Sequence, residues 1–290
     1  MTVALSSIRE IERELGQLRD ASTGPEAAPL LRTSVMTHIA WVPARWAEQA
    51  RGTLSGLAER HPSRTILLFP CPDEAEDVLE GEVDFRCFVH GGHEKEVCSE
   101  VIAIRLCGAR AAAPASVVTP LLVSDLPAFL RWRGPLPFGA DELDQMVGVV
   151  DRLVVDSREW TDVRGDLGRL PALFDRVAVS DISWARTLPW RAGVAELWPD
   201  VAEAAVIRVA GPEPEALLLQ GWLATRLGRD VQLEHEPAGE VELVAVDGRG
   251  ARPGRVEPKS PSDLLSDELE VFGRDRVYEE AVRSFSPDPT

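Results

Sequence analysis

The chain has 290 residues, of which 44% are hydrophobic and 27% are charged, a balance typical of a soluble folded protein with one or two domains. Its 48 acidic residues outnumber its 31 lysines and arginines, which gives a formal net charge of −17 at pH 7. This surplus argues against a nucleic-acid partner, because binding a phosphate backbone requires clustered basic residues.

No apolar run approaches the roughly 20 residues that a membrane-spanning helix needs, so no membrane partner is expected. The segment Met1–Leu5 leads directly into a charged helical pattern and lacks the anatomy of a signal peptide. These observations predict a cytoplasmic protein. Disulfides are uncommon in that compartment, so all four cysteines are expected to be thiols: Cys71, Cys87, Cys98 and Cys107.

Residues 1–29 are predicted to form an amphipathic helix followed by a linker. Ser7 and Glu10 have the spacing of a capping box. The apolar residues that follow repeat at heptad spacing: Ile8, Ile11, Leu15 and Leu18. This narrow stripe favours docking of the helix on its own domain, with contact to a partner chain as the alternative. The small, Pro- and Gly-containing segment Ser22–Pro29 predicts a linker.

Residues 30–162 are predicted to form an N-terminal α/β domain. Alternating or continuous apolar runs predict strands at Thr33–Val42, Thr65–Phe69, Glu82–Val89, Glu96–Leu106, Ala128–Trp132 and Arg152–Val155. Helical patterns occupy Ala47–Arg60, Pro114–Leu122 and Ala140–Val149. The third and fourth strands flank His90-Gly91-Gly92, which predicts a β-hairpin.

Residues 163–290 are predicted to form a C-terminal α/β domain with a helical tail. Helices are expected at Leu167–Phe174 and Pro214–Leu227, and strands at Ala204–Val209, Asp230–Glu234 and Val241–Val246. Two acidic amphipathic helices, Ser262–Phe272 and Arg274–Phe285, complete the chain. Because helices and strands alternate throughout, the pattern predicts a mixed α/β protein in two unequal parts.

One cluster has the residue types of a metal site. Cys87, His90, His93 and Cys98 flank the hairpin loop, and two thiolates with two imidazoles suit tetrahedral zinc. If the turn centres between Gly92 and His93, the two cysteines lie directly opposite each other, whereas a one-residue shift separates them. The spacing is tighter than that of ordinary zinc fingers. We therefore favour partly buried cysteines and solvated histidines, and expect no bound metal.

The signatures of common α/β enzymes are missing, including the phosphate-binding glycine loops, the zinc-protease helix and the nucleophile elbow. We therefore predict no catalytic residue and no cofactor. His38 is expected to be a strand residue, and His61 a residue at a helix end, rather than a general base. Asp156 follows a buried strand, where α/β proteins place ligands, although capping of the next helix is equally plausible.

The segment Asp181–Arg191 has the densest concentration of tryptophan and arginine in the chain. These two residue types dominate binding hot spots, although tryptophan is also an ordinary core residue. Six side chains are candidates for a partner-binding surface or an anion-binding site: Trp132, Arg133, Trp184, Arg186, Trp190 and Arg191. We expect Arg186 and Arg191 to be exposed and to contribute little to folding.

Several segments resemble, in order, motifs of the actinobacterial OpcA family: His61–Arg64, Ala115–Leu122, Asp125–Gly134, Asp151–Ser157, Asp181–Arg191 and Leu217–Leu223. The resemblance extends from about Thr33 to the C-terminal helices and leaves Met1–Pro29 outside it. It is specific, because several long motifs occur in the same order.

The resemblance implies a non-catalytic assembly factor or allosteric activator of glucose-6-phosphate dehydrogenase, at the entry to the oxidative pentose phosphate pathway. Such a protein activates by binding the active form of its partner more tightly than the inactive form. Some family members are associated with thiol-dependent regulation, but no cysteine follows Cys107, so no switch in the C-terminal half is implied.

Two alternative functions stay open. One is a sugar-phosphate- or nucleotide-sensing regulatory subunit, in which the arginines hold phosphate. The other is an unrecognised enzyme on a glycosyltransferase-like fold. Assembly of the chain into a homo-oligomer also stays open.

Overall fold

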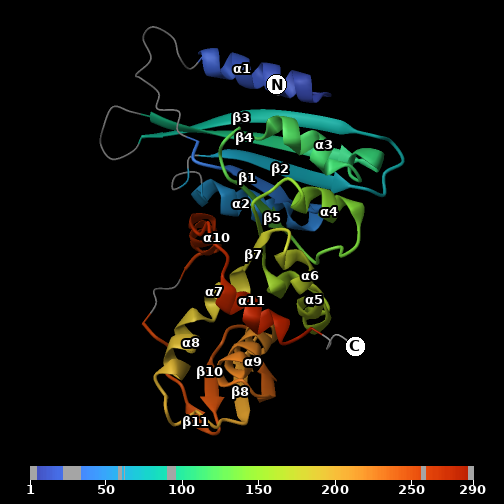
Figure 1. Ribbon diagram of the computed structural model, residues 1–290. Helices are drawn as coiled ribbons and strands as arrows, with labels where there is room; N and C mark the ends of the chain where they lie inside the picture. Colours follow the sequence, from blue (N-terminus) through green and yellow to red (C-terminus); the bar gives the residue numbers. More distant parts are fainter. Residues whose placement is uncertain are drawn as a thin grey trace. The chain divides into compact units, whose positions relative to one another are not determined.

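The computed structural model describes residues 5–21, 34–57, 61, 63–89, 96–255 and 259–286, which form two compact units (Figure 1). The first unit comprises Met1–Arg133, Pro137–Leu153 and Pro261–Glu270, and the second comprises Gly134–Leu136, Val154–Ser260 and Val271–Thr290. The mixed α/β class is confirmed. The chain visits each unit more than once, so the division at residues 162 and 163 stays a prediction.

The first unit is built on a mainly parallel sheet. Its strands lie in the order β3-β4-β2-β1-β5, with the bounds β1 Thr37–Trp41, β2 Arg64–Cys71, β3 Leu79–Val89, β4 Glu96–Cys107 and β5 Ala128–Trp132. β1 pairs in parallel with β2 and β5, β2 pairs in parallel with β4, and β3 pairs with β4 as an antiparallel hairpin. All five residues of β1 and of β5 are buried, which explains their near-continuous apolar sequences.

Helices cover this sheet, with the bounds α2 Ala47–Leu57, α3 Pro114–Val118, α4 Asp141–Val147 and α10 Pro261–Glu270. A core cluster beneath α2 contains Ala40, Val42, Ala50 and Leu67. α10 contacts α2, and the Ser262 hydroxyl donates a hydrogen bond of 2.8 Å to the Thr53 carbonyl. The predicted acidic helix therefore contributes to the first unit, although it is distant in sequence from the sheet.

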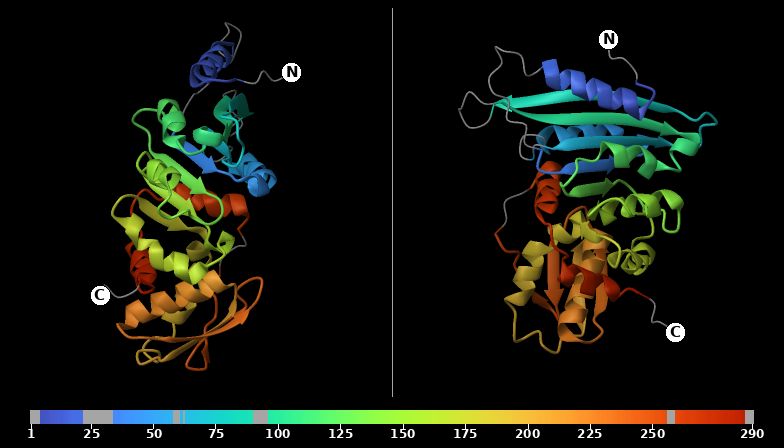
Figure 2. Two further views of the ribbon diagram at one scale, coloured as in Figure 1. Left: turned by 90° about the vertical axis from the view of Figure 1, so that its right-hand side faces the viewer. Right: turned by 45° about the horizontal axis from the view of Figure 1, so that its top comes forward.

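The N-terminal helix α1 (Ile8–Ala21) lies alongside β3, as the views in Figures 1 and 2 agree. Ile11 and Leu15 of the predicted stripe are buried. Gly81 favours this approach, since a Cβ there would lie 2.6 Å from Ile11 Cδ1 and the Ile11 side chain would have to move. Docking of this helix on its own unit is thus confirmed. The predicted linker, Ser22–Pro29, lies outside the described residues.

The second unit contains a further sheet with the strand order β11-β10-β8-β9. The strands are β8 Val206–Gly211, β9 Gln232–Pro237, β10 Leu243–Val246 and β11 Arg249–Gly250, and β8 runs parallel to β9 but antiparallel to β10. Two short strands precede it in sequence: β6 (Arg152–Val155), within which the division between the units falls, and β7 (Ala178–Asp181). The candidate site begins with Asp156, which directly follows β6, and with Asp181, the last residue of β7.

The helices of this unit are α5 Val163–Arg169, α6 Pro171–Phe174, α7 Ile182–Arg186, α8 Leu188–Ala195, α9 Glu213–Leu227 and α11 Arg276–Arg283, with a short 3₁₀ helix, η4, at Ser157–Glu159. α9 ends where Gly228 adopts the left-handed conformation (φ 64°) that favours glycine. α11 packs against α9, α5 and α6. In the described part of the chain, no helix has the length and apolar character needed to cross a membrane.

Candidate functional site

The ends of β6 and β7 come together in the second unit. Asp156 directly follows β6, and Asp181 is the last residue of β7. Asp181 Oδ1 accepts hydrogen bonds from the backbone N–H groups of Ser157 (3.1 Å) and Ser183 (2.9 Å). Asp181 thereby caps α7 and fixes it next to the start of η4. A short aspartate suits this position, because its carboxylate reaches N–H groups that a helix end leaves unpaired.

Asp156 is the centre of a network of hydrogen bonds. Its side chain caps η4 by accepting from the Arg158 N–H, and it also accepts from the Ser183 hydroxyl at 2.9 Å. The Arg186 guanidinium binds both of its carboxylate oxygens, at 2.9 and 3.0 Å. The capping role foreseen for Asp156 is confirmed. The bidentate ion pair with Asp156 restrains the Arg186 side chain firmly.

A second arginine extends this network. Arg158 Nε donates to Glu215 at the start of α9, and its two terminal nitrogens bind both oxygens of Glu240 at 2.9 Å. Arg186 also lies 3.8 Å from Glu215. The Glu215 side chain is fully buried. We call Asp156, Arg158, Arg186, Glu215 and Glu240 the charged network.

Burial changes the acidity of two carboxyl groups here. Burial, reinforced by the nearby Asp156 charge, raises the pKa of Asp181 to about 7. Burial also raises the pKa of Glu215 to about 7, even though Arg158 and Arg186 oppose this change. Asp181 Oδ2 has no hydrogen-bond partner among the described residues. Both groups therefore titrate near neutral pH.

Replacing Asp181 with asparagine should alter how stability depends on pH. In the wild type the pKa of Asp181 in the folded state lies above its value in the unfolded state. The contribution of Asp181 to the free energy of unfolding is therefore present at low pH and is lost as pH rises from about 4 to 7. Asparagine keeps the oxygen that accepts from Ser157 and Ser183 and does not ionise. Each unit of pKa shift is worth about 1.4 kcal/mol, so the variant should gain stability relative to wild type over this range.

Urea unfolding at pH 4.5 and pH 8 measures the effect. The control is Asp230→Asn, which replaces an exposed aspartate of the same unit and should show no such gain in stability. Parallel pH profiles for Asp181→Asn and wild type would contradict a raised pKa at Asp181.

The tryptophan of the predicted segment packs inside the second unit. Trp184 is 4% exposed, and its indole N–H donates to Asp275 at 2.7 Å. Tyr278 of α11 lies 5.7 Å from it, and the Arg191 guanidinium stacks 3.5 Å over its ring. Burial lowers the pKa of Arg191 to about 10. Because the chain bends between α7 and α8, Trp184 and Arg191 are in contact although they do not share one helical face.

The remaining candidates are also buried. Trp190 is 9% exposed. Trp132, in the first unit, stacks on Trp41 with ring centroids 4.7 Å apart. Arg133, also in the first unit, lies over the Trp46 ring and donates to Gln49 at 2.6 Å. The six candidates therefore divide between the two units. Their role in partner or anion binding stays a prediction.

The expectation that Arg186 and Arg191 are exposed is wrong. The Arg186 side chain is 20% exposed and forms an ion pair with Asp156, while Arg191 stacks on Trp184 and donates to Thr187 at 3.0 Å. Short-range sequence patterns could not reveal this, because Asp156 is 30 residues away. Both arginines are anchors of the fold.

The two histidines occupy the predicted positions. His38 lies in β1, and burial, with the charges of Arg131 and His61, lowers its pKa to about 3. Such an imidazole is a weak base. His61 follows α2, and its Nε2 lies 2.6 Å from the Ser266 hydroxyl of α10. These contacts place both histidines in the packing of the first unit.

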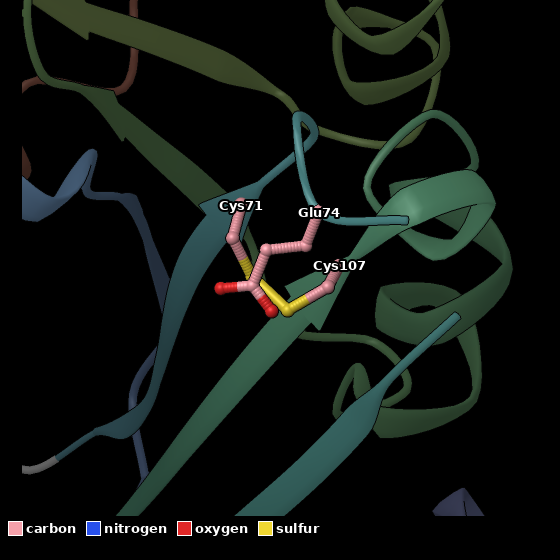
Figure 3. Close-up of side chains that lie close together, drawn as sticks. All are labelled: Cys71, Glu74 and Cys107. Atoms are coloured by element: carbon pink, nitrogen blue, oxygen red, sulfur yellow. A yellow bond between two sulfur atoms is a disulfide. The ribbon is translucent and has the colours of Figure 1, made fainter. Parts of the chain in front are cut away.

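Two cysteines form a disulfide, so the expectation of thiols is wrong for Cys71 and Cys107 (Figure 3). They are register partners at the ends of β2 and β4, with Cα atoms 4.5 Å apart, a separation that a disulfide bridges. Glu74 lies beside them, but its carboxylate accepts from Arg105. Metal binding requires thiolates, so in this state the three residues form a disulfide next to an ion pair.

The hairpin pairs Cys87 directly with Cys98, which is the register expected if the turn centres between Gly92 and His93. Of these two residues the structure describes only the backbone, and His90 and His93 lie outside the described residues. The zinc alternative therefore stays a prediction.

Several residues of the charged network were not found by sequence reasoning. Arg158, Glu215 and Glu240 meet across separations of 57 and 82 residues. One signal was available for Glu215, a charged residue in the first turn of α9 that directly precedes the apolar run Ala216–Leu219. Asp275 was also missed, because it lies inside the helix predicted at Arg274–Phe285, whereas in the structure its side chain caps the start of α11.

These features define a two-unit mixed α/β protein whose clustered charged residues pair with one another. Residues 55–172 match the family model described as the glucose-6-phosphate dehydrogenase subunit N-terminal domain, and residues 177–282 match the corresponding C-terminal domain. The chain therefore belongs to the OpcA family of glucose-6-phosphate dehydrogenase subunits.

Two cyanobacterial relatives bear the name putative OxPP cycle protein OpcA. The protein from Nostoc punctiforme is 25% identical over 228 residues, which cover 75% of this chain and 49% of the relative. The protein from Synechococcus elongatus is 24% identical over 208 residues, which cover 67% and 46%, respectively. The chain thus spans about half the length of the curated relatives that it matches.

Proposed function

We propose that this chain is a non-catalytic assembly factor and allosteric activator of glucose-6-phosphate dehydrogenase, acting in the cytoplasm in the oxidative pentose phosphate pathway. The observation that carries the proposal is the family match, which runs through both α/β units from residue 55 to residue 282. The charged network supports a role without chemistry, because its arginines and carboxylates are engaged with one another.

Activation requires differential affinity. A protein that binds active and inactive dehydrogenase equally shifts neither population, however tightly it binds. We propose that this chain binds the active form more tightly. The buried tryptophans and arginines then act by holding the second unit's surface in one shape, since Trp184 and Arg186 offer little exposed area for direct contact.

The experiment that tests the proposal measures NADP reduction in three samples: dehydrogenase alone, this chain alone, and the two together. We expect a higher rate in the mixture than in dehydrogenase alone, and no reduction by this chain. NADP reduction by the isolated chain, after verified removal of dehydrogenase, would contradict the non-catalytic role.

A second candidate function, a regulatory subunit that senses a sugar phosphate, is supported by one observation. The second unit has a cavity lined by three arginines. Arginine binds phosphate oxygens through paired N–H donors.

A further inference from the structure

The cavity lies beside α11 and is separate from the charged network. It has a volume of about 330 Å³, at the small end of the range for ligand sites. All the described residues that line it are charged: Asp175, Arg274, Arg276, Glu279, Glu280 and Arg283. A lining of this kind suits a small, highly polar ligand rather than an apolar one.

Two of its carboxylates are already neutralised. Arg274 Nε donates to Glu279 at 2.7 Å, and a terminal nitrogen of the same arginine donates to the Phe174 carbonyl. Glu280 pairs with Arg226 of α9. These contacts also fix Arg274 at the edge of the cavity.

Two arginines keep their charge available. Among the described residues, neither Arg276 nor Arg283 has a carboxylate partner within ion-pair distance. Arg283 lies 5.2 Å over the Phe174 ring, an arrangement that orients its guanidinium and leaves the in-plane N–H donors accessible. The acidic residues of this chain outnumber its basic residues by 17. Two guanidiniums in one cavity that form no ion pair with a described carboxylate therefore favour an external anion.

Asp175 adds a different chemistry to the same cavity. Its side chain is exposed, and no hydrogen bond or ion pair engages it in the described part of the chain. A carboxylate repels phosphate but accepts hydrogen bonds from hydroxyl groups. The combination of guanidiniums and a carboxylate therefore suits a molecule that carries both a phosphate and hydroxyls.

We infer that this cavity binds a sugar phosphate, with its phosphate on Arg276 and Arg283 and a hydroxyl donating to Asp175. In the part of the chain that the structure describes, no aromatic residue lines the cavity to stack against a nucleobase, which disfavours a nucleotide. The inference deepens the sensing function proposed above.

Calorimetric titration of the isolated chain tests this site with three probes: glucose 6-phosphate, inorganic phosphate and glucose. We expect glucose 6-phosphate to bind, inorganic phosphate to bind more weakly, and glucose not to bind. The double variant Arg276→Ala/Arg283→Ala should weaken binding about tenfold or more, since charge-assisted hydrogen bonds are lost. Arg208→Ala, which removes an exposed arginine on β8, is the matched control and should bind as wild type does.

The double variant also loses the contact between Arg283 and Phe174, and this loss could lower its stability. The single variant Arg276→Ala is therefore measured as well, because it keeps that contact and replaces an exposed side chain. Unchanged glucose 6-phosphate affinity in a folded Arg276→Ala variant would overturn the site. Equal affinity for phosphate and glucose 6-phosphate would overturn the role of Asp175. Because no dehydrogenase is present in this assay, its failure leaves the assembly role standing.

Discussion

Replacing Arg186 with alanine is expected to lower the free energy of unfolding by about 3–5 kcal/mol, the usual cost of removing one partner from a buried ion pair. The change leaves Asp156, whose side chain is 10% exposed, without its bidentate partner. It also removes a positive charge 3.8 Å from the fully buried Glu215. Arg158 would then be the one arginine left in the charged network, beside the three carboxylates of Asp156, Glu215 and Glu240.

Urea unfolding at pH 8 measures this loss. The control is Arg208→Ala, since the exposed Arg208–Glu236 pair should contribute about 0–1 kcal/mol. The double variant Arg186→Ala/Asp156→Ala should lose less than the sum of the two single variants, because it leaves no unpaired carboxylate at position 156. A change of less than about 1 kcal/mol for Arg186→Ala would show that the charged network does not stabilise the second unit.

Gly221→Ala is expected to separate α9 from α11. A Cβ at this position would lie 2.5 Å from the Ala281 carbonyl oxygen and 2.8 Å from Phe285 Cε2. Backbone atoms cannot rotate away as a flexible side chain does, so the expected loss is about 3 kcal/mol, at the upper end for overpacking. α11 also carries Tyr278, which lies against Trp184, so the change should disturb the packing of the predicted tryptophan segment.

Tryptophan fluorescence during urea unfolding follows this effect. Gly239→Ala is the matched control, because a Cβ there meets nothing within 4 Å. If Gly221→Ala unfolds at the same urea concentration as this control, α11 does not pack against α9 as described.

The sequence predicts elements best where breakers flank a strong apolar run. The strand at Ala128–Trp132 was foreseen with its observed bounds, since Pro127 and Gly134 flank it. The hairpin was foreseen, but the sequence left its register open between two alternatives, because the position of the turn was not fixed. β7 (Ala178–Asp181) was missed, since its apolar residues are followed at once by Ser180 and Asp181, whereas the equally short β6 has the continuous apolar run Leu153–Val155.

Long-range pairings could not be foreseen in the same way. Cys71 and Cys107 meet because β2 and β4 are neighbours although β3 lies between them in sequence. The partners of Arg186 and Arg158 likewise depend on how β6, α7 and α9 come together. The sequence therefore identified Asp181–Arg191 as unusual, but its two arginines were expected to be exposed, whereas Arg186 pairs with Asp156 and Arg191 stacks on Trp184.

We propose that this chain activates glucose-6-phosphate dehydrogenase by binding its active form more tightly. A titration of dehydrogenase with this chain, which follows the rate of NADP reduction and the molecular mass of the complex in the same samples, tests this proposal. We expect the rate to rise with the fraction of dehydrogenase in the complex and to saturate when the complex is fully formed. A complex that forms with no change in rate, or a rate that does not respond because no complex forms, would contradict it.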